Sequence, residues 1–217
     1  MRTPLRKSVA AAAPLLAAAL SLGCRSLPFP EPNLEGEYGG VLRTWTREQA
    51  VYEGLETRAF AQVIYLAPPL VDAQASMVSR LRAEPPPARA RTLERMRRET
   101  ATPTFFVVMR TPDRNWNDLE AKNSVWRVAV DFGGGEFEPE KVERLERPFS
   151  AELQKLYPYL DEYAVAYVLR FPAAAAAAAP VVSAASAAGP KTASLPVMIM
   201  AGALGTMRFN WTVPGRR

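Results

Sequence analysis

Thr104–Arg110, which reads TFFVVMR, is a continuous run of apolar side chains that ends on an arginine. A short run of aromatic and β-branched residues is typical of a strand buried on both faces. Further along, Ser124–Phe132 alternates instead, with large apolar side chains at every second position. That alternation is the pattern of a strand with one buried face. The two stretches therefore predict a fully buried strand and a half-buried one.

Other stretches on both sides have the same character. We predict two long strands within Val41–Leu66, a charged edge strand at Lys141–Leu145 and an alternating strand at Tyr163–Phe171. A closing hairpin is expected from Leu195–Met200 and Thr206–Val213. Seven or eight short strands separated by turn signals favour a mainly β fold, an antiparallel β-sandwich. A barrel is the alternative.

Two or three helices are predicted in the connections between strands. Residues 68–101 form a helical insertion, because Pro68-Pro69 suits a helix start and apolar residues then recur at near-helical spacing. Ser150 is a good N-cap for a short helix that follows it. The Ala-rich segment 172–194 has low complexity and is predicted to be a loop.

The first residues have the three parts of an export signal. Arg2, Arg6 and Lys7 give a positive start, and residues 9–22 are uncharged and apolar. This apolar stretch is shorter than the ~20 residues that a membrane-spanning helix needs. Small residues then lead to Cys24, the only cysteine of the chain.

The segment Leu20-Ser21-Leu22-Gly23-Cys24 resembles the lipobox of bacterial lipoproteins, with Ser21 where leucine is usual. This resemblance implies cleavage before Cys24, attachment of a diacylglycerol to that cysteine, and further acylation of its amine. By the same analogy, Arg25 favours the outer membrane, with the domain facing the periplasm. The alternative is an ordinary cleaved signal in which Cys24 is incidental. The mature domain resembles only uncharacterised lipoproteins, which implies no particular activity.

The chain is thus expected to divide into three parts. Residues 1–23 are a signal peptide, 24–37 a lipidated cysteine with a Pro-rich tether, and 38–217 a single β-sandwich domain. Alternate prolines in the tether favour an extended run of about 3.1 Å per residue, which would hold the domain up to ~40 Å from the bilayer.

Composition excludes several kinds of chemistry. Histidine is absent, which excludes histidine-based catalytic triads and histidine metal sites. With Cys24 lipidated, thiolate catalysis and thiolate metal sites are excluded as well. The formal charge of +5 falls to about +2 without the leader, a poor basis for nucleic-acid binding. We therefore predict no cofactor, no metal and no nucleic-acid partner.

Two surface features remain as candidates for contact with a partner. Seven arginines and three glutamates lie between Arg80 and Glu99, and this stretch could bind acidic partners or lipid headgroups. A solvated helix face is the favoured interpretation of such a charge run. Trp116 lies in a polar loop, whereas Trp45, Trp126 and Trp211 are expected in the core. The candidate contact residues are Trp116, Arg89, Arg91, Arg95 and Arg98.

Acidic residues offer weaker alternatives. The segment Asp113–Asp118 superficially echoes a calcium loop, but Asp118 and Ser124 stand where an EF-hand needs glycine and glutamate. Asp161 and Glu162 are adjacent, so in a strand their side chains point to opposite faces. Polar turns are the favoured interpretation of both groups.

These observations favour a membrane-anchored envelope lipoprotein whose specific function the sequence does not name. We expect a non-enzymatic module that contacts the bilayer through acylated Cys24 and binds another envelope protein or supports an assembly. One alternative is a carboxylate-dependent hydrolase of envelope glycan that uses acids such as Asp113, Asp118, Asp161 or Glu162. Another is a carrier of an apolar ligand, which requires an apolar cavity.

Overall fold

The computed structural model describes residues 36–178 and 195–211 of the chain. The chain divides into two units, Met1–Glu31 and Pro32–Arg217, and the described residues belong to the second. Cys24, the signal peptide, the tether up to residue 35 and residues 179–194 lie outside the described residues. Within them, nine strands form two antiparallel sheets joined by short helices. The predicted mainly β fold, an antiparallel sandwich with helices in the connections, is therefore confirmed.

The larger sheet has five strands and contains the buried run identified above as its central strand. Its strand order is β1 (Thr46–Glu53), β2 (Glu56–Tyr65), β3 (Thr104–Arg110), β7 (Val165–Arg170), β6 (Lys141–Arg144). The charged strand β6 lies at an edge, as predicted. The smaller sheet has the order β5 (Glu136–Phe137), β4 (Trp126–Asp131), β8 (Val197–Gly202), β9 (Gly205–Asn210).

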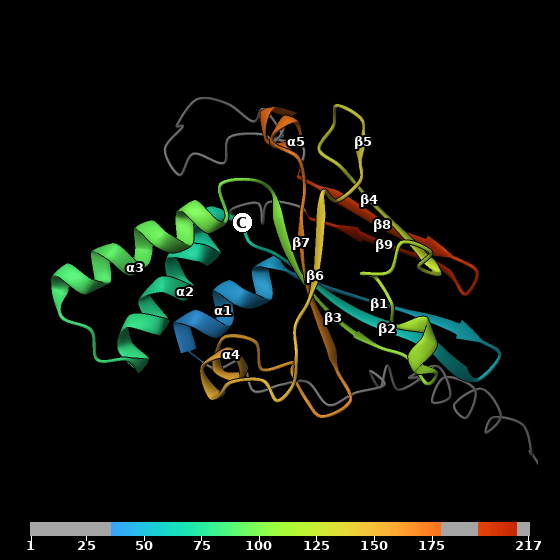
Figure 1. The fold of residues 1–217 in the computed structure, drawn as a ribbon, viewed down its shortest axis with the longest axis horizontal. Coiled ribbons are helices and arrows are strands. Elements are labelled where there is room, and N and C mark those ends of the chain that lie inside the picture. Colours follow the sequence, from blue (N-terminus) through green and yellow to red (C-terminus); the bar gives the residue numbers. More distant parts are fainter. Residues whose placement is uncertain (1–35, 179–194, 212–217) are drawn as a thin grey trace, which may run out of the picture. The chain divides into compact units, whose positions relative to one another are not determined.

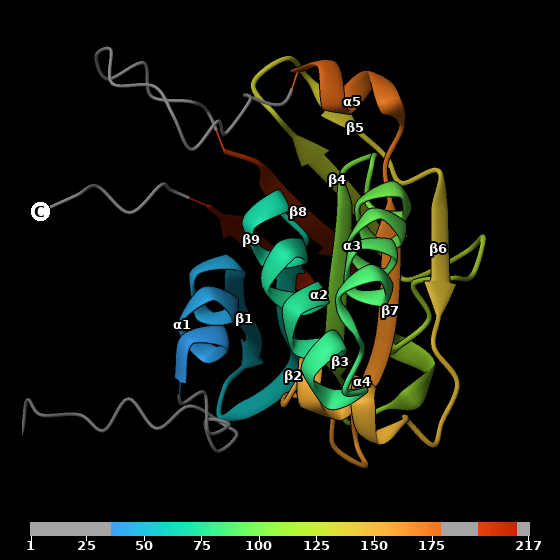
Figure 2. The same ribbon diagram turned by 90° about the vertical axis from the view of Figure 1, so that its left-hand side faces the viewer.

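Helices cover the outer face of the five-stranded sheet, and the second sheet covers its inner face (Figure 1). The helical elements are α1 (Gly36–Trp45), α2 (Pro68–Leu81), α3 (Pro86–Glu99), α4 (Ala151–Leu156) and α5 (Ala173–Ala178). Helices α1, α2 and α3 lie side by side (Figure 2), and α3 packs on α2 rather than on the sheet. The predicted helical insertion 68–101 is confirmed as the hairpin of α2 and α3.

Strand β3 is buried along its whole length because both of its faces are covered. Phe106 faces the helices and stacks on Tyr157, with ring centroids 3.7 Å apart. Phe105 faces the other sheet and lies between Tyr65, at 4.9 Å, and Trp211, at 5.5 Å. Aromatic side chains of this size bury the most apolar surface per residue, so this layer holds the two sheets together.

Three local predictions were wrong. The first predicted strand began at Val41, but residues 36–45 form α1, which buries Leu42 and Trp45 at helical spacing. This helix also takes in Gly36 and Glu37, which the sequence assigned to the tether. The Ala-rich segment was predicted to be a loop, yet its residues 173–178 form α5, as alanine's high helix propensity explains.

The closing hairpin is confirmed, and its two glycines allow neighbouring strands to approach it closely. A side chain at Gly202 would lie 2.0 Å from the carbonyl oxygen of Val125. Gly205 has a φ of +139°, which other residues rarely adopt, and a side chain there would meet Val51 at 2.8 Å. The hairpin therefore brings β9 close against β1 at one side of the sandwich.

Candidate functional site

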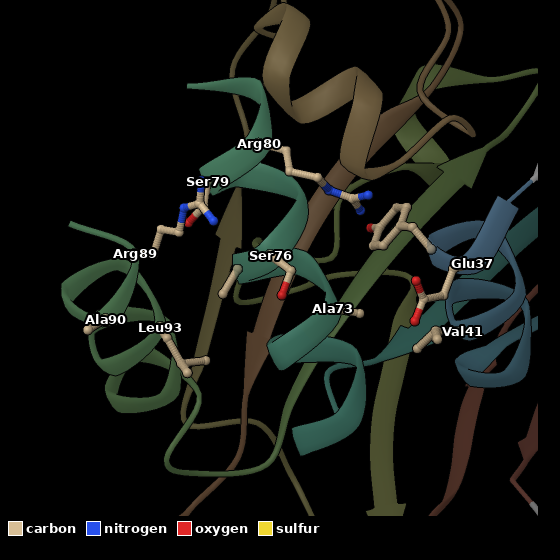
Figure 3. A pocket seen from close by; sticks show the side chains of 11 residues that line it. Glu37, Val41, Ala73, Ser76, Ser79, Arg80, Arg89, Ala90 and Leu93 are labelled. Carbon is tan, nitrogen blue, oxygen red and sulfur yellow. The ribbon is translucent and has the colours of Figure 1, made fainter. Parts of the chain in front are cut away.

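A groove of about 470 Å³ lies among helices α1, α2 and α3 (Figure 3). Its sides carry apolar residues such as Val41, Ala73 and Leu93, one from each helix. Arg80 reaches from α2 toward α1, and Arg89 lies on α3 close to α2. The residues that line it are Glu37, Tyr38, Val41, Ala73, Ala75, Ser76, Ser79, Arg80, Arg89, Ala90 and Leu93.

The amphipathic pattern of α2 explains the floor of the groove. The helix starts with two prolines at its first positions, and its apolar stripe faces the sheet, where Leu70, Val71 and Val78 are buried. Small residues such as Ala73 and Ser76 are left on the opposite face. Because these side chains are short, they do not fill the space above α2. Helices α1 and α3 therefore form the two sides of a depression.

Tyr38 and Tyr157 connect helices α1, α4 and α2 by hydrogen bonds and so fix one wall of the groove. The Tyr38 hydroxyl donates to the carbonyl oxygen of Leu156 at 2.6 Å, and Gln74 donates to the Tyr157 hydroxyl at 2.9 Å. Burial raises the pKa of both phenols above the ordinary value of 10. Both phenols therefore stay neutral and act as structural hydrogen-bonding groups.

Glu84 in the turn between α2 and α3 holds the two helices together. Its carboxylate accepts hydrogen bonds from Ser79 at 2.9 Å and from Thr92 at 2.9 and 3.0 Å, and Arg82 lies 3.8 Å away. The two hydroxyl hydrogen bonds and the guanidinium lower its pKa. The backbone carbonyl of Glu84 also accepts from Arg89 at 2.7 Å, which places this arginine at the groove.

A second, charged surface lies on the side of α3 opposite the groove and at the end of α2. We name it the basic flank. It consists of the four arginines of a shallow depression that has a volume of about 460 Å³. These arginines are Arg82, Arg91, Arg95 and Arg98, and the depression also includes Glu84, Ala88, Thr92 and Glu94. The structure therefore brings three of the predicted contact arginines together. Arg89, the fourth, lies on the opposite side of α3, in the groove.

Trp116 does not belong to either surface. It ends a single turn of 3₁₀ helix, η2 (Arg114–Trp116), which follows β3, whereas α3 precedes β3. The seven-residue strand thus puts about 20 Å, at ~3.3 Å per residue, between η2 and the C-terminal end of α3. Trp116 is half-buried, and the guanidinium of Arg58 lies 5.6 Å from its ring centroid. The other three tryptophans are buried, as predicted.

Three of the four acids considered for catalysis, Asp113, Asp118 and Asp161, accept hydrogen bonds from their own loops. Asp113 accepts from the backbone of Asn115 at 2.9 Å, and Asp118 accepts from Ser124 at 2.9 Å. Glu162 is exposed in the turn before β7. Within residues 36–178 and 195–211, no three acidic side chains gather to hold a metal ion.

Sequence reasoning missed the central role of Arg110. Its side chain is only 8% exposed and pairs with Asp161, with nitrogen and oxygen 2.8 Å apart. It also donates to the side chain of Gln62 at 3.1 Å and to the backbone carbonyl of Tyr159. The available signal was the position of this arginine, at the end of a strand that is apolar from Phe105 to Met109. Asp161 is therefore a structural ion-pair partner.

No family model, curated protein or solved structure matches the chain. Among the described helices, none has both the length and the apolar character needed to cross a membrane.

Proposed function

We propose that the chain is a lipid-anchored protein of the bacterial envelope that binds another envelope protein through the groove among α1, α2 and α3. The observation that carries the proposal is the position of this groove at the start of the folded domain. Glu37 and Tyr38, at the beginning of α1, line it, and α1 directly follows the tether. The leader and Cys24 support the anchor, and Arg25 supports the outer membrane.

The chemistry of the groove suits a protein segment with an apolar side chain beside a carboxylate. Val41 and Leu93 offer apolar surface on two sides. Arg80 and Arg89 add two cations and Glu37 one anion. Neither arginine forms an ion pair with an acidic side chain among the described residues. A carboxylate of the partner would satisfy one of them while an apolar side chain filled the floor.

Binding is better supported than hydrolysis or transport of an apolar ligand. Asp113 and Asp118 are engaged in loop hydrogen bonds, and Asp161 is paired with Arg110. The space between the sheets is filled by aromatic side chains, among them Phe105, Phe171 and Trp211. Release of soluble fragments from envelope glycan by the purified protein, dependent on Asp113 or Asp118, would contradict the non-enzymatic part of the proposal.

The anchor is tested by growing cells with a labelled fatty acid. The native chain should carry the label and fractionate with the outer membrane, and the Cys24→Ser variant should lose the label. A matched control is Ser21→Leu, which restores the usual lipobox leucine and should keep the label. Undiminished labelling of Cys24→Ser would overturn the anchor.

The groove is tested with a photo-crosslinking amino acid placed at Ala73 in living cells. The control position is Thr206 on β9, in the other sheet. We expect a crosslinked protein from position 73 only, and we expect Arg80→Glu to abolish the product. Identical products from both positions, or a product indifferent to Arg80→Glu, would show that the groove is not the binding site.

A further inference from the structure

Helix α3 is the most exposed helix of the described domain and the most strongly charged. Its sequence, PPARARTLERMRRE, has five arginines and two glutamates, and Thr92 is its only buried residue. Leu93 and Met96 are half-buried; Met96 packs against the core, and Leu93 lines the groove. Its outer surface is therefore almost entirely charged.

The ion pairs of this region leave part of its positive charge uncompensated. Arg82 makes two hydrogen bonds with Glu152, at 2.7 and 2.8 Å, and Arg95 pairs with Glu99 at 3.3 Å. Arg91 and Arg98 are exposed and have no ion-pair partner among the described residues. Glu84, which accepts from Ser79 and Thr92, and Glu94 are acids of the same depression. Residues 80–99 together with the partners Asp72 and Glu152 have seven arginines and five acids, which leaves a net charge of +2 around the basic flank.

The basic flank also lacks the features of a protein-binding surface. The uncharged residues of its depression are Ala88 and Thr92, and no aromatic side chain lines it. Protein interfaces depend on buried aromatic or apolar anchors, which the groove on the other side of α3 offers and this flank does not. Exposed arginines without such an anchor suit a surface of many phosphates.

The tether is long enough to bring this flank to the bilayer that holds the anchor. The described residues start at Gly36 with α1, and α1, α2 and α3 lie side by side (Figure 2). Packed helices are 8–10 Å apart, so α3 is about 20 Å from α1. Residues 24–35 span up to ~40 Å when extended. The tether therefore allows the helical layer to face the membrane.

We propose that the basic flank rests on the anionic headgroups of the bilayer and orients the domain on it. This inference rests on the lipid anchor of the proposed function. Because α3 offers no exposed apolar stripe, the contact is electrostatic and shallow, and it weakens as salt is added. The flank thereby faces the lipid while the groove on the other side of α3 stays open to a protein partner.

The experiment uses the acylated protein reconstituted in vesicles. Because Cys24 carries the lipid, a newly introduced cysteine is the only free thiol, and a fluorophore can be attached at Ala88→Cys on the flank. The matched control is Ala203→Cys in the turn between β8 and β9, in the other sheet. Lipids with a spin label in the headgroup quench the fluorophore when it lies at the bilayer surface.

We expect quenching at position 88 in vesicles of phosphatidylglycerol and phosphatidylcholine, and little in phosphatidylcholine alone. Quenching at position 203 should not depend on the anionic lipid. Each flank arginine replaced by glutamine should lower the ratio of docked to undocked domains about fivefold. A charge-matched control replaces Arg127, Arg144 and Arg208, which are exposed on other faces.

The outcomes separate the two proposals. Absence of the fatty acid from the native chain overturns the anchor and this inference with it. An acylated chain whose quenching at position 88 is equal in both kinds of vesicle overturns this inference alone. The inference is also overturned if replacing Arg91, Arg95 and Arg98 by glutamine leaves the lipid quenching at position 88 unchanged. A photo-crosslink from position 88 to an acidic protein, abolished by the same replacement, would then assign the flank to that protein.

Discussion

Strand β3 and helix α3 are neighbours in the chain and opposite in character. Every residue of β3 is buried, whereas α3 buries one. Both carry arginine at their C-terminal ends, but Arg110 is enclosed by its acceptors and Arg98 is exposed without an ion-pair partner among the described residues. The difference shows that a buried arginine uses its hydrogen bonds to stabilise the fold, whereas an exposed arginine keeps its charge available to an external partner.

The largest effect is expected where β3 joins the two sheets. Phe105 is fully buried between Tyr65, Phe171 and Trp211. Phe105→Ala should lower the free energy of unfolding by about 3–5 kcal/mol, because it removes aromatic contacts and leaves a cavity. With an m-value of ~2 kcal/mol/M, the urea midpoint should fall by about 2 M.

The control for this prediction is Leu55→Ala at the tip of the β1–β2 hairpin. Leu55 is fully exposed, so its truncation should leave the midpoint nearly unchanged. A similar small change for Phe105→Ala would mean that the aromatic layer does not hold the sheets together.

The next largest effect is expected at Arg110, and it is compared with the loss of stability when Arg98 is replaced in the same way. Arg110→Met keeps the length of the side chain but leaves the Gln62 amide and the Tyr159 carbonyl without their donor. We expect a loss of about 2–3 kcal/mol of stability, since unsatisfied buried acceptors are costly. Arg98→Met should change stability by less than ~0.5 kcal/mol. Equal losses in urea unfolding would contradict the distinction drawn between β3 and α3.

The strands could be predicted from the sequence because their patterns are local. The continuous apolar run of β3 and the alternation of β4 follow from which faces are covered. Helix α1 was missed, because its glycines and its Thr44-Trp45 end carry weak helix propensity. Its buried Leu42 and Trp45 are explained by packing on α2 and the sheet, which the local sequence does not record.

The candidate surfaces could be predicted only in part. Arg91, Arg95 and Arg98 recur at helical spacing, so their common flank follows from the sequence. The groove does not, since it needs three helices in contact. The position of Arg110 at the end of an apolar strand signalled a buried arginine, but its partners Gln62 and Asp161 could not be identified, because they are 48 and 51 residues away in the chain.

A smaller effect should appear in the pH dependence of stability. The pKa of Glu84 lies below its ordinary value of 4.5, so its stabilising contribution is fully present above 4.5. It is lost as the pH falls through the lowered pKa of the folded state. The native protein should therefore lose more stability than Glu84→Gln between about pH 6 and about pH 3. Urea midpoints at both pH values measure this, and equal losses would show that Glu84 does not join α2 to α3 as a carboxylate.

The smallest effect on folding is expected on the basic flank itself. Replacing Arg91, Arg95 and Arg98 by glutamine removes exposed cations from a helix that already has good propensity, and glutamine preserves it. The free energy of unfolding should change by less than ~0.5 kcal/mol per substitution. The same variant should nevertheless lose anionic-lipid quenching at position 88. A chain that unfolds as readily as Arg110→Met would instead assign these arginines to the fold, and the contrast between α3 and β3 would disappear.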